Sequence, residues 1–163
     1  MRKTFVPLDD VLIEHVFQPA SDLMFVQFGL IRATLACFCI DAASLAWIVS
    51  RTAALSDAVK TTAVTTVCFD AAVLLLGLAA LISLRTVFRR AATKQQANPL
   101  RLAMQPHRAV VLLMLAARVV EMRAPELADA ADLGMLICAT SALYLGACAE
   151  HPPIRRSVPA FAS

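Results

Sequence analysis

The chain contains 163 residues, of which 60% are hydrophobic and only 6% aromatic, and its formal net charge is +3. Its mean hydropathy is +0.71, and its apolar content exceeds the ~45–50% of a typical soluble domain. This composition argues against an ordinary soluble domain and indicates a small integral membrane protein. The length suits a single domain, and Arg outnumbers Lys twelve to three, a bias typical of GC-rich bacterial genomes.

Residues 1–22 are predicted to form a cytoplasmic segment that contains a short amphipathic helix at residues 7–18. Asp9, Asp10 and Glu14 interrupt the apolar run that a cleaved signal peptide needs, so no signal peptide is expected. Apolar side chains recur at the spacing of one helical face: Leu8, Val11, Leu12 and Val16.

Two interpretations of this N-terminal helix remain open. It packs as a flap on its own bundle, or it offers its apolar face as a docking site for a partner protein. Pro19 is expected to end the helix. The acidic side of the helix is repelled by anionic headgroups and is expected to meet the basic loop that lies on the same side of the membrane.

Four apolar segments predict transmembrane helices, at about residues 24–50, 59–84, 106–122 and 130–149. A span needs roughly 20 residues, which the first, second and fourth segments provide. The third segment has a shorter apolar run, and it crosses only if Arg108 and Arg118 extend towards opposite headgroup layers. The sequence therefore predicts an all-α bundle of four transmembrane helices over residues 24–149, with both termini cytoplasmic.

The connecting segments carry the charge that orients these helices. Residues 85–108 form a loop with six basic residues and no acid: Arg85, Arg89, Arg90, Lys94, Arg101 and Arg108. Loops rich in Arg and Lys stay on the cytoplasmic side, so this loop, residues 1–22 and the tail at 150–163 are all expected inside. Because topology already accounts for these charges, no nucleic-acid partner is expected.

Two carboxylates lie inside the predicted spans. Asp41 and Asp70 occur in similar short motifs, CIDAASL and CFDAAVL. Counted from the predicted outer ends of their helices, both lie roughly 14–17 Å deep, close to the bilayer midplane. An ionised Asp at this depth costs at least roughly 2.5–3.5 kcal/mol, so it needs a partner, water or a proton. The hairpin of the first two helices is expected to bring the two carboxylates face to face.

Arg118 is the expected counter-charge for these carboxylates, with Glu121, three residues later, as the competing local partner. Arg32 lies within two turns of the inner end of its helix, where its side chain reaches the headgroups. Three interpretations stay open. The charges lock helices together, they bind and move a proton or another cation, or they contact a helix of another subunit. The sequence favours the first.

The fourth apolar segment carries a stripe of small residues at four-residue steps: Ala130, Gly134, Cys138, Ala142 and Gly146. Small side chains allow the backbone of a second helix to approach closely. The stripe is therefore expected to pack against a helix, which belongs either to the same bundle or to another subunit.

No motif in the sequence assigns a reaction. The five cysteines lie in apolar segments without a CxxC spacing, the three histidines lie outside the span interiors, and no phosphate-binding or helical metal-binding motif occurs. No metal, cofactor or enzyme activity is expected, although the cysteines leave a membrane enzyme as a third hypothesis.

The first functional hypothesis is an accessory or structural subunit of a larger bacterial inner-membrane complex. Its expected partners are the lipid bilayer and other membrane subunits, or further copies of itself. The alternative is a small proton- or cation-coupled transporter or channel that uses Asp41 and Asp70.

Overall fold

The computed structural model describes residues 6–60, 64–91, 99–121 and 127–148, and all regular structure in these ranges is helical. The elements are α1 (Val6–Leu12), the π-helix η1 (Ile13–Phe17), α2 (Gln18–Phe28), α3 (Arg32–Lys60), α4 (Val64–Ala91), α5 (Pro99–Ala103), α6 (Gln105–Glu121) and α7 (Leu127–Ala147). Within these ranges the predicted all-α class is confirmed. Lys94 and the predicted tail at 150–163 lie outside the described residues.

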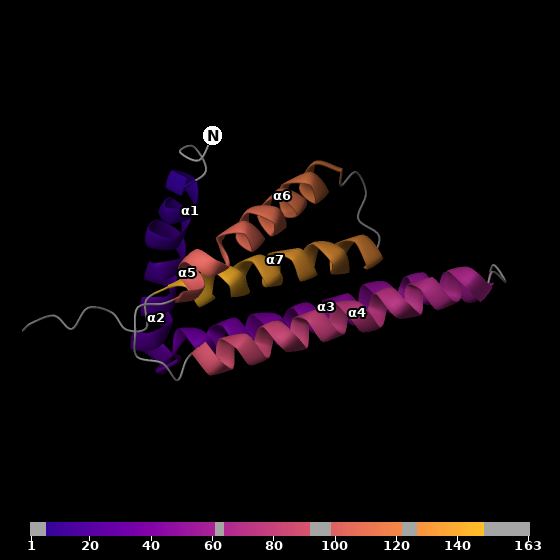
Figure 1. Cartoon of the computed structure of the whole chain (residues 1–163), viewed down its shortest axis with the longest axis horizontal. Coiled ribbons are helices and arrows are strands. Elements are labelled where there is room, and N and C mark those ends of the chain that lie inside the picture. Colours follow the sequence, from indigo (N-terminus) through magenta and orange to yellow (C-terminus); the bar gives the residue numbers. More distant parts are fainter. Residues whose placement is uncertain (1–5, 61–63, 92–98, 122–126, 149–163) are drawn as a thin grey trace, which may run out of the picture.

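Helices α3 and α4 form a long antiparallel hairpin along the longest dimension of the protein (Figure 1). α3 runs for 29 residues to Lys60, so the helix itself ends ten residues later than predicted, although its candidate membrane span ends at Ala53. Residues 51–60 contain no Gly or Pro, the residues that most strongly disfavour a helix. The predicted start at residue 24 is also wrong, because Gly29 adopts a left-handed φ of 66° and ends α2.

Helix α7 lies along α3, and this is the most extensive helix–helix contact in the described chain. α3 buries Ala36, Ala43 and Ser50, which follow each other at seven-residue steps, and Ile40 lies between them. Small residues at this spacing share one face of a helix and allow a close approach. The sequence prediction did not include this face, although its spacing is visible in the sequence.

Three helices are long and apolar enough to cross a membrane, over Arg32–Ala53, Val64–Arg90 and Asp129–Ala147. α6 is not among them. It has 17 residues, and at 1.5 Å per residue its length is roughly 25 Å, which is shorter than a hydrocarbon core of about 30 Å. The structure therefore supports three spans by length and composition, and a fourth crossing is considered under the proposed function.

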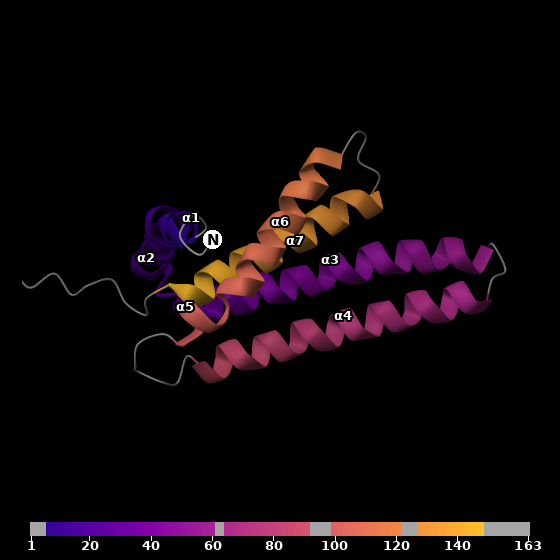
Figure 2. The ribbon, with the colours of Figure 1, turned by 45° about the horizontal axis from the view of Figure 1, so that its top comes forward.

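The N-terminal helices α1, η1 and α2 form one rod, called here the N-terminal rod, which stands across the end of the hairpin (Figures 1 and 2). Pro19 does not end the helix as the sequence predicts. It lies in the first turn of α2, directly after the π-turn of η1. A π-turn changes the local hydrogen-bond pattern, so the chain passes the proline and remains helical to Phe28.

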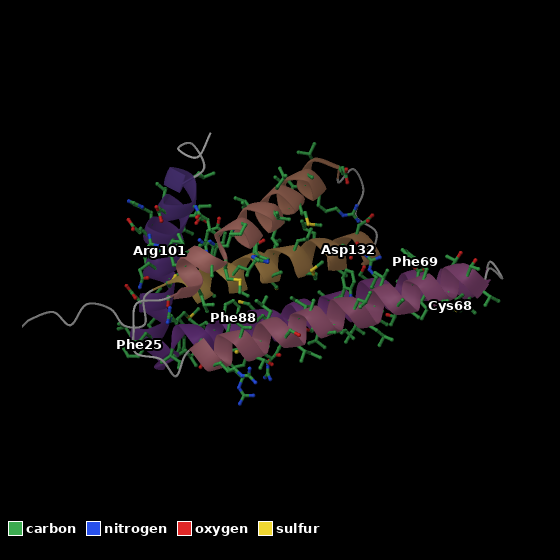
Figure 3. All side chains as sticks on the ribbon, in the orientation of Figure 1. Phe25, Cys68, Phe69, Phe88, Arg101 and Asp132 are labelled. Atoms are coloured by element: carbon green, nitrogen blue, oxygen red, sulfur yellow. The ribbon has the colours of Figure 1, made fainter. Side chains whose placement is uncertain are left out.

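The core lies near the carboxyl end of α7, where α7 meets the hairpin and the N-terminal rod. Phe88 of α4 is 2% exposed and packs in one cluster with Ile40 of α3 (Figure 3). A second cluster joins Ile13 of η1 to Tyr144 of α7. The ring of Phe17 stacks on Tyr144 with centroids 4.8 Å apart, an arrangement that adds to the energy of apolar burial.

Candidate functional site

Arg108 attaches the N-terminal rod to α6. Its Nε donates to Asp9 Oδ1 at 2.9 Å and its Nη2 donates to Asp9 Oδ2 at 2.6 Å, so the pair is bidentate and charge-assisted. The guanidinium lies 5.6 Å from the ring centroid of Tyr144, and the side chain is only 1% exposed. Arg108 therefore lies buried within the protein, with Asp9 as its counter-charge.

Arg101 of α5 makes a second, more exposed attachment to the rod (Figure 3). Its Nη2 lies 2.8 Å from Asp10 Oδ1 and 2.9 Å from Glu14 Oε1, and these hydrogen bonds raise the pKa of Arg101. Its side chain is 42% exposed. The contacts of Arg101 with Asp10 and Glu14 and of Arg108 with Asp9 are together called the N-terminal clamp. The clamp provides the predicted contact between the acidic side of the rod and the basic segment.

The N-terminal rod buries only part of its apolar surface. Ile13 is 1% exposed and packs against α7, with Leu12 half-buried beside it. Leu8, Val11 and Val16 remain 50%, 48% and 51% exposed. The rod thus packs on its own bundle, as the flap interpretation requires, and leaves these three residues, called here the apolar strip, about half-exposed.

A second group of charged residues lies at the amino end of α7, where Figure 3 labels Asp132. Asp132 accepts a hydrogen bond from Ser50 Oγ of α3. Its Oδ2 lies 3.5 Å from Arg51 Nη2 and 3.5 Å from Arg118 Nη2. Arg118 Nη2 also lies 2.6 Å from Asp129 Oδ1. These five residues, the distal cluster, join α3, α6 and α7.

The distal cluster gives Arg118 two carboxylate partners that were not predicted, Asp129 and Asp132, in addition to the predicted Glu121. Its closest carboxylate is Asp129, and the predicted local partner Glu121 lies further away, at 3.9 Å. The cluster also contains Asp132, which the sequence prediction missed. The sequence DAAD at residues 129–132 shares its first three residues with the motifs of Asp41 and Asp70 and is a signal for this site, but the partner Arg51 lies outside the four predicted spans.

Asp41 pairs with Arg85 of α4, so the predicted pairing with Asp70 or Arg118 is wrong. Asp41 Oδ1 lies 2.9 Å from Arg85 Nε, and Oδ2 accepts a hydrogen bond from Nη2 at 3.3 Å. Arg85 and Asp70 are fifteen positions apart in α4, a distance of roughly 22 Å. The predicted match in depth fails because it counts from residue 50, whereas α3 continues further and Asp70 lies close to the hairpin turn.

Arg32 is buried at the start of α3, and its Nη1 donates to the carbonyl of Cys148 at the end of α7. An arginine at this place satisfies a free carbonyl of the last turn and interacts favourably with the helix dipole. Arg32 therefore joins the start of α3 to the end of α7. Burial raises the pKa of Cys148 to about 11, so its thiol is protonated and unreactive at neutral pH.

The small-residue stripe of α7 is packed against other helices of the bundle over about half of its length. A Cβ added at Gly146 would overlap the buried ring of Phe88, so this half packs inside the bundle. At Gly134 an added Cβ meets no atom within 4 Å, and Ala130 is exposed. Cys138 is half-buried between the two halves. The structure therefore leaves the amino half of the stripe open.

The predicted basic loop begins later in the chain, because α4 continues to Ala91. Arg85, Arg89 and Arg90 therefore lie on a helix, and the last two are exposed at its end. The described basic residues thus occupy two places, the carboxyl end of α4 and the clamp.

A cavity of about 70 Å³ lies between the rod, α6 and α7, lined by Leu8, Asp9, Gln105, Ala109, Leu112 and Tyr144. Ligand pockets typically measure roughly 300–1,000 Å³, so this cavity is too small for a substrate. Among the described residues, no group of three or more His, Cys, Asp or Glu side chains is arranged to hold a metal ion. No protein-family model, curated protein or solved structure matches the chain.

Proposed function

We propose that the protein is a small integral-membrane accessory subunit of a larger bacterial inner-membrane complex. In this proposal α3, α4 and α7 cross the bilayer, and the basic segment 85–108 faces the cytoplasm by the positive-inside rule. The N-terminal rod and the carboxyl end of α7 then lie at the cytoplasmic surface. Three helices of sufficient length and hydropathy support this placement.

Helix α6 makes a fourth, short crossing in this proposal, which places both termini in the cytoplasm. Arg108 binds its first turns to the clamp and Arg118 binds its last turn to the distal cluster, so α6 runs between the same two ends as α7. It exposes apolar side chains, including Leu113 at 69% and Met114 at 54%. A short helix is accommodated when the bilayer thins locally or when the helix packs against other helices.

The main support for the subunit proposal is that the apolar strip is exposed on a helix whose position is fixed by the clamp. Leu8, Val11 and Val16 are half-exposed on a rod that a buried bidentate ion pair holds in place. At the cytoplasmic surface these side chains face water, and apolar residues on a preorganised helix are typical of a helix that docks into a groove. The proposed occupant is an apolar groove on another subunit of the complex.

The open half of the small-residue stripe supports the same proposal from within the membrane. Gly134 and Ala130 offer a shallow surface, because among the described residues no atom lies within 4 Å of a Cβ added at Gly134 and Ala130 is exposed. A transmembrane helix of a partner would approach closely there.

The carrier hypothesis has no comparable support. Its two proposed ion-binding residues, Asp41 and Asp70, lie roughly 22 Å apart along the hairpin, and Asp41 already has a cationic partner in Arg85. An accessory subunit, by contrast, needs no catalytic residue or ion pathway of its own.

Native mass spectrometry of the complex, extracted from the membrane in a mild detergent, tests the subunit proposal. We expect the chain to leave the membrane with other polypeptides at a fixed stoichiometry. Val11→Asp puts a charge on the apolar strip and is expected to release the partner bound there. Val26→Asp is the matched control, because Val26 of α2 is 75% exposed and lies outside the strip. Extraction as a monomer only, or an unchanged complex with Val11→Asp, would contradict the proposal.

A further inference from the structure

A basic groove opens on the exposed side of α4, close to its carboxyl end. It has a volume of about 350 Å³ and is lined by Ile82, Arg85, Thr86, Arg89 and Arg90. Residues at this spacing lie on one face of a helix, and nitrogen-bearing side chains project from this end of α4 in Figure 3. The volume lies in the range of roughly 300–1,000 Å³ that is typical of ligand pockets.

The lining of the groove carries three guanidinium groups and no carboxylate. Asp41 of α3 approaches Arg85 with 2.9 Å between Oδ1 and Nε, and it thereby fixes the direction of this guanidinium. The lining therefore presents three positive side chains, one of which is paired with Asp41. A half-open site with this charge attracts an anion.

The groove lies at the end of a candidate membrane span, Val64–Arg90. Along the same helix, α4 exposes Leu75, Leu76 and Ile82 at 66%, 71% and 60%, so apolar surface leads towards the basic groove. The positive-inside rule accounts for arginines at the very end of a span. It does not account for Arg85, which lies one turn deeper and is oriented by an acid of the neighbouring helix.

We propose that this groove binds the phosphate group of an anionic phospholipid. Arg89 and Arg90 donate hydrogen bonds to the phosphate oxygens, and Arg85 adds a third cation that Asp41 keeps in position. Guanidinium groups bind phosphate through paired N–H donors, and basic pockets at the cytoplasmic ends of transmembrane helices bind anionic headgroups. The inference rests on the membrane placement proposed above, but it requires no protein partner.

The experiment uses the full chain in vesicles of equimolar phosphatidylcholine and phosphatidylglycerol. After gentle release, native mass spectrometry counts the lipids that remain bound. We expect the protein to retain phosphatidylglycerol, and we expect Arg89→Ala/Arg90→Ala to reduce its retention about tenfold, which corresponds to about 1.4 kcal/mol. Arg155→Ala/Arg156→Ala removes the same charge from the tail and is expected to leave retention unchanged.

Two further measurements test the role of Asp41 and distinguish a lipid phosphate from a free anion. Asp41→Asn is expected to lower retention about threefold, because Arg85 loses the charge that orients it, and circular dichroism checks that the variant is folded. Inorganic phosphate is expected not to displace the lipid, and displacement at low millimolar concentration would assign the groove to a free anion. Equal retention by the wild type and the Arg89/Arg90 variant would overturn the inference. Failure of the protein to float with neutral vesicles would overturn the proposed membrane placement as well.

Discussion

At the carboxyl end of α7 every residue from 142 to 148 is buried, whereas at its amino end residues 129–135 are all at least partly exposed. The buried end combines apolar packing around Phe88 and Tyr144 with an ion pair whose arginine is 1% exposed. The exposed end is held by the distal cluster, where the side chain of Arg118 is 33% exposed.

The two ends of α7 therefore have different structural roles. The buried end fixes the positions of the N-terminal rod, the hairpin and α7 relative to one another, because a packed core allows few alternative arrangements. The exposed end is held by ion pairs that need little covered surface, so the helix keeps a face on which a neighbour can pack.

The largest effect is expected from Arg108→Ala at the buried end. The substitution leaves the carboxylate of Asp9 without its partner, and removal of one member of a buried pair costs roughly 3–5 kcal/mol. The free energy of unfolding, followed by circular dichroism in detergent micelles, is the measurement. Protease sensitivity of the rod should rise in parallel, because its main attachment is lost.

Arg101→Ala is the control for this prediction, since it removes a cation from the same clamp. Its ion pairs are 42% exposed on the arginine side, and exposed pairs contribute about 0–1 kcal/mol. If both variants lost the same stability, the buried geometry of Arg108 would not be what attaches the rod.

The helical class, three apolar spans and the contact of the acidic rod with basic residues are all predictable from the sequence. These features follow from the composition and charge pattern of each segment and do not depend on where the helices end. The pairing of Asp41 was not predictable in the same way, because it depends on where α3 ends. No Gly or Pro marks that end, and a shift of ten residues moves a side chain roughly 15 Å along the helix.

A smaller effect is expected from the two glycines of the α7 stripe. A methyl group at Gly146 would overlap the ring of Phe88, which is 2% exposed and has little room to move. Overpacking of this kind costs roughly 1–3 kcal/mol. Gly146→Ala should therefore lower the midpoint of thermal unfolding.

Gly134→Ala is the matched change at the exposed end, where an added methyl group meets no atom within 4 Å. Ala is favoured over Gly in a helix by up to about 1 kcal/mol, so this variant should be as stable as the wild type or slightly more stable. A loss of stability as large as that of Gly146→Ala would show that both halves of the stripe are packed in the isolated protein.

The small-residue stripe shows that residue spacing alone does not predict which positions of a helix face are covered by a neighbour. Four-residue steps predict a face of small residues, and the structure contains that face. Whether each position is covered depends on the neighbouring helices, and Phe88 reaches Gly146 only because α4 ends beside the carboxyl end of α7. Arg51 and Asp132 were missed for a related reason, since α3 had to continue beyond residue 50 for them to meet.

The smallest effect is expected from Asp132→Asn in the distal cluster. Asn keeps an oxygen that accepts the hydrogen bond of Ser50, but it loses the charge that lies 3.5 Å from each of two arginines. These contacts are long and partly exposed, so the loss should be about 1 kcal/mol. Glu121→Gln removes a carboxylate that is 70% exposed and 3.9 Å from Arg118, and it should have no measurable effect.

Because the amino end of α7 depends on the charges of Asp132 and Asp129, high salt should reduce the stability difference between Asp132→Asn and the wild type. A difference that persists at high salt would mean that apolar packing, as at the carboxyl end, also holds this end of the helix.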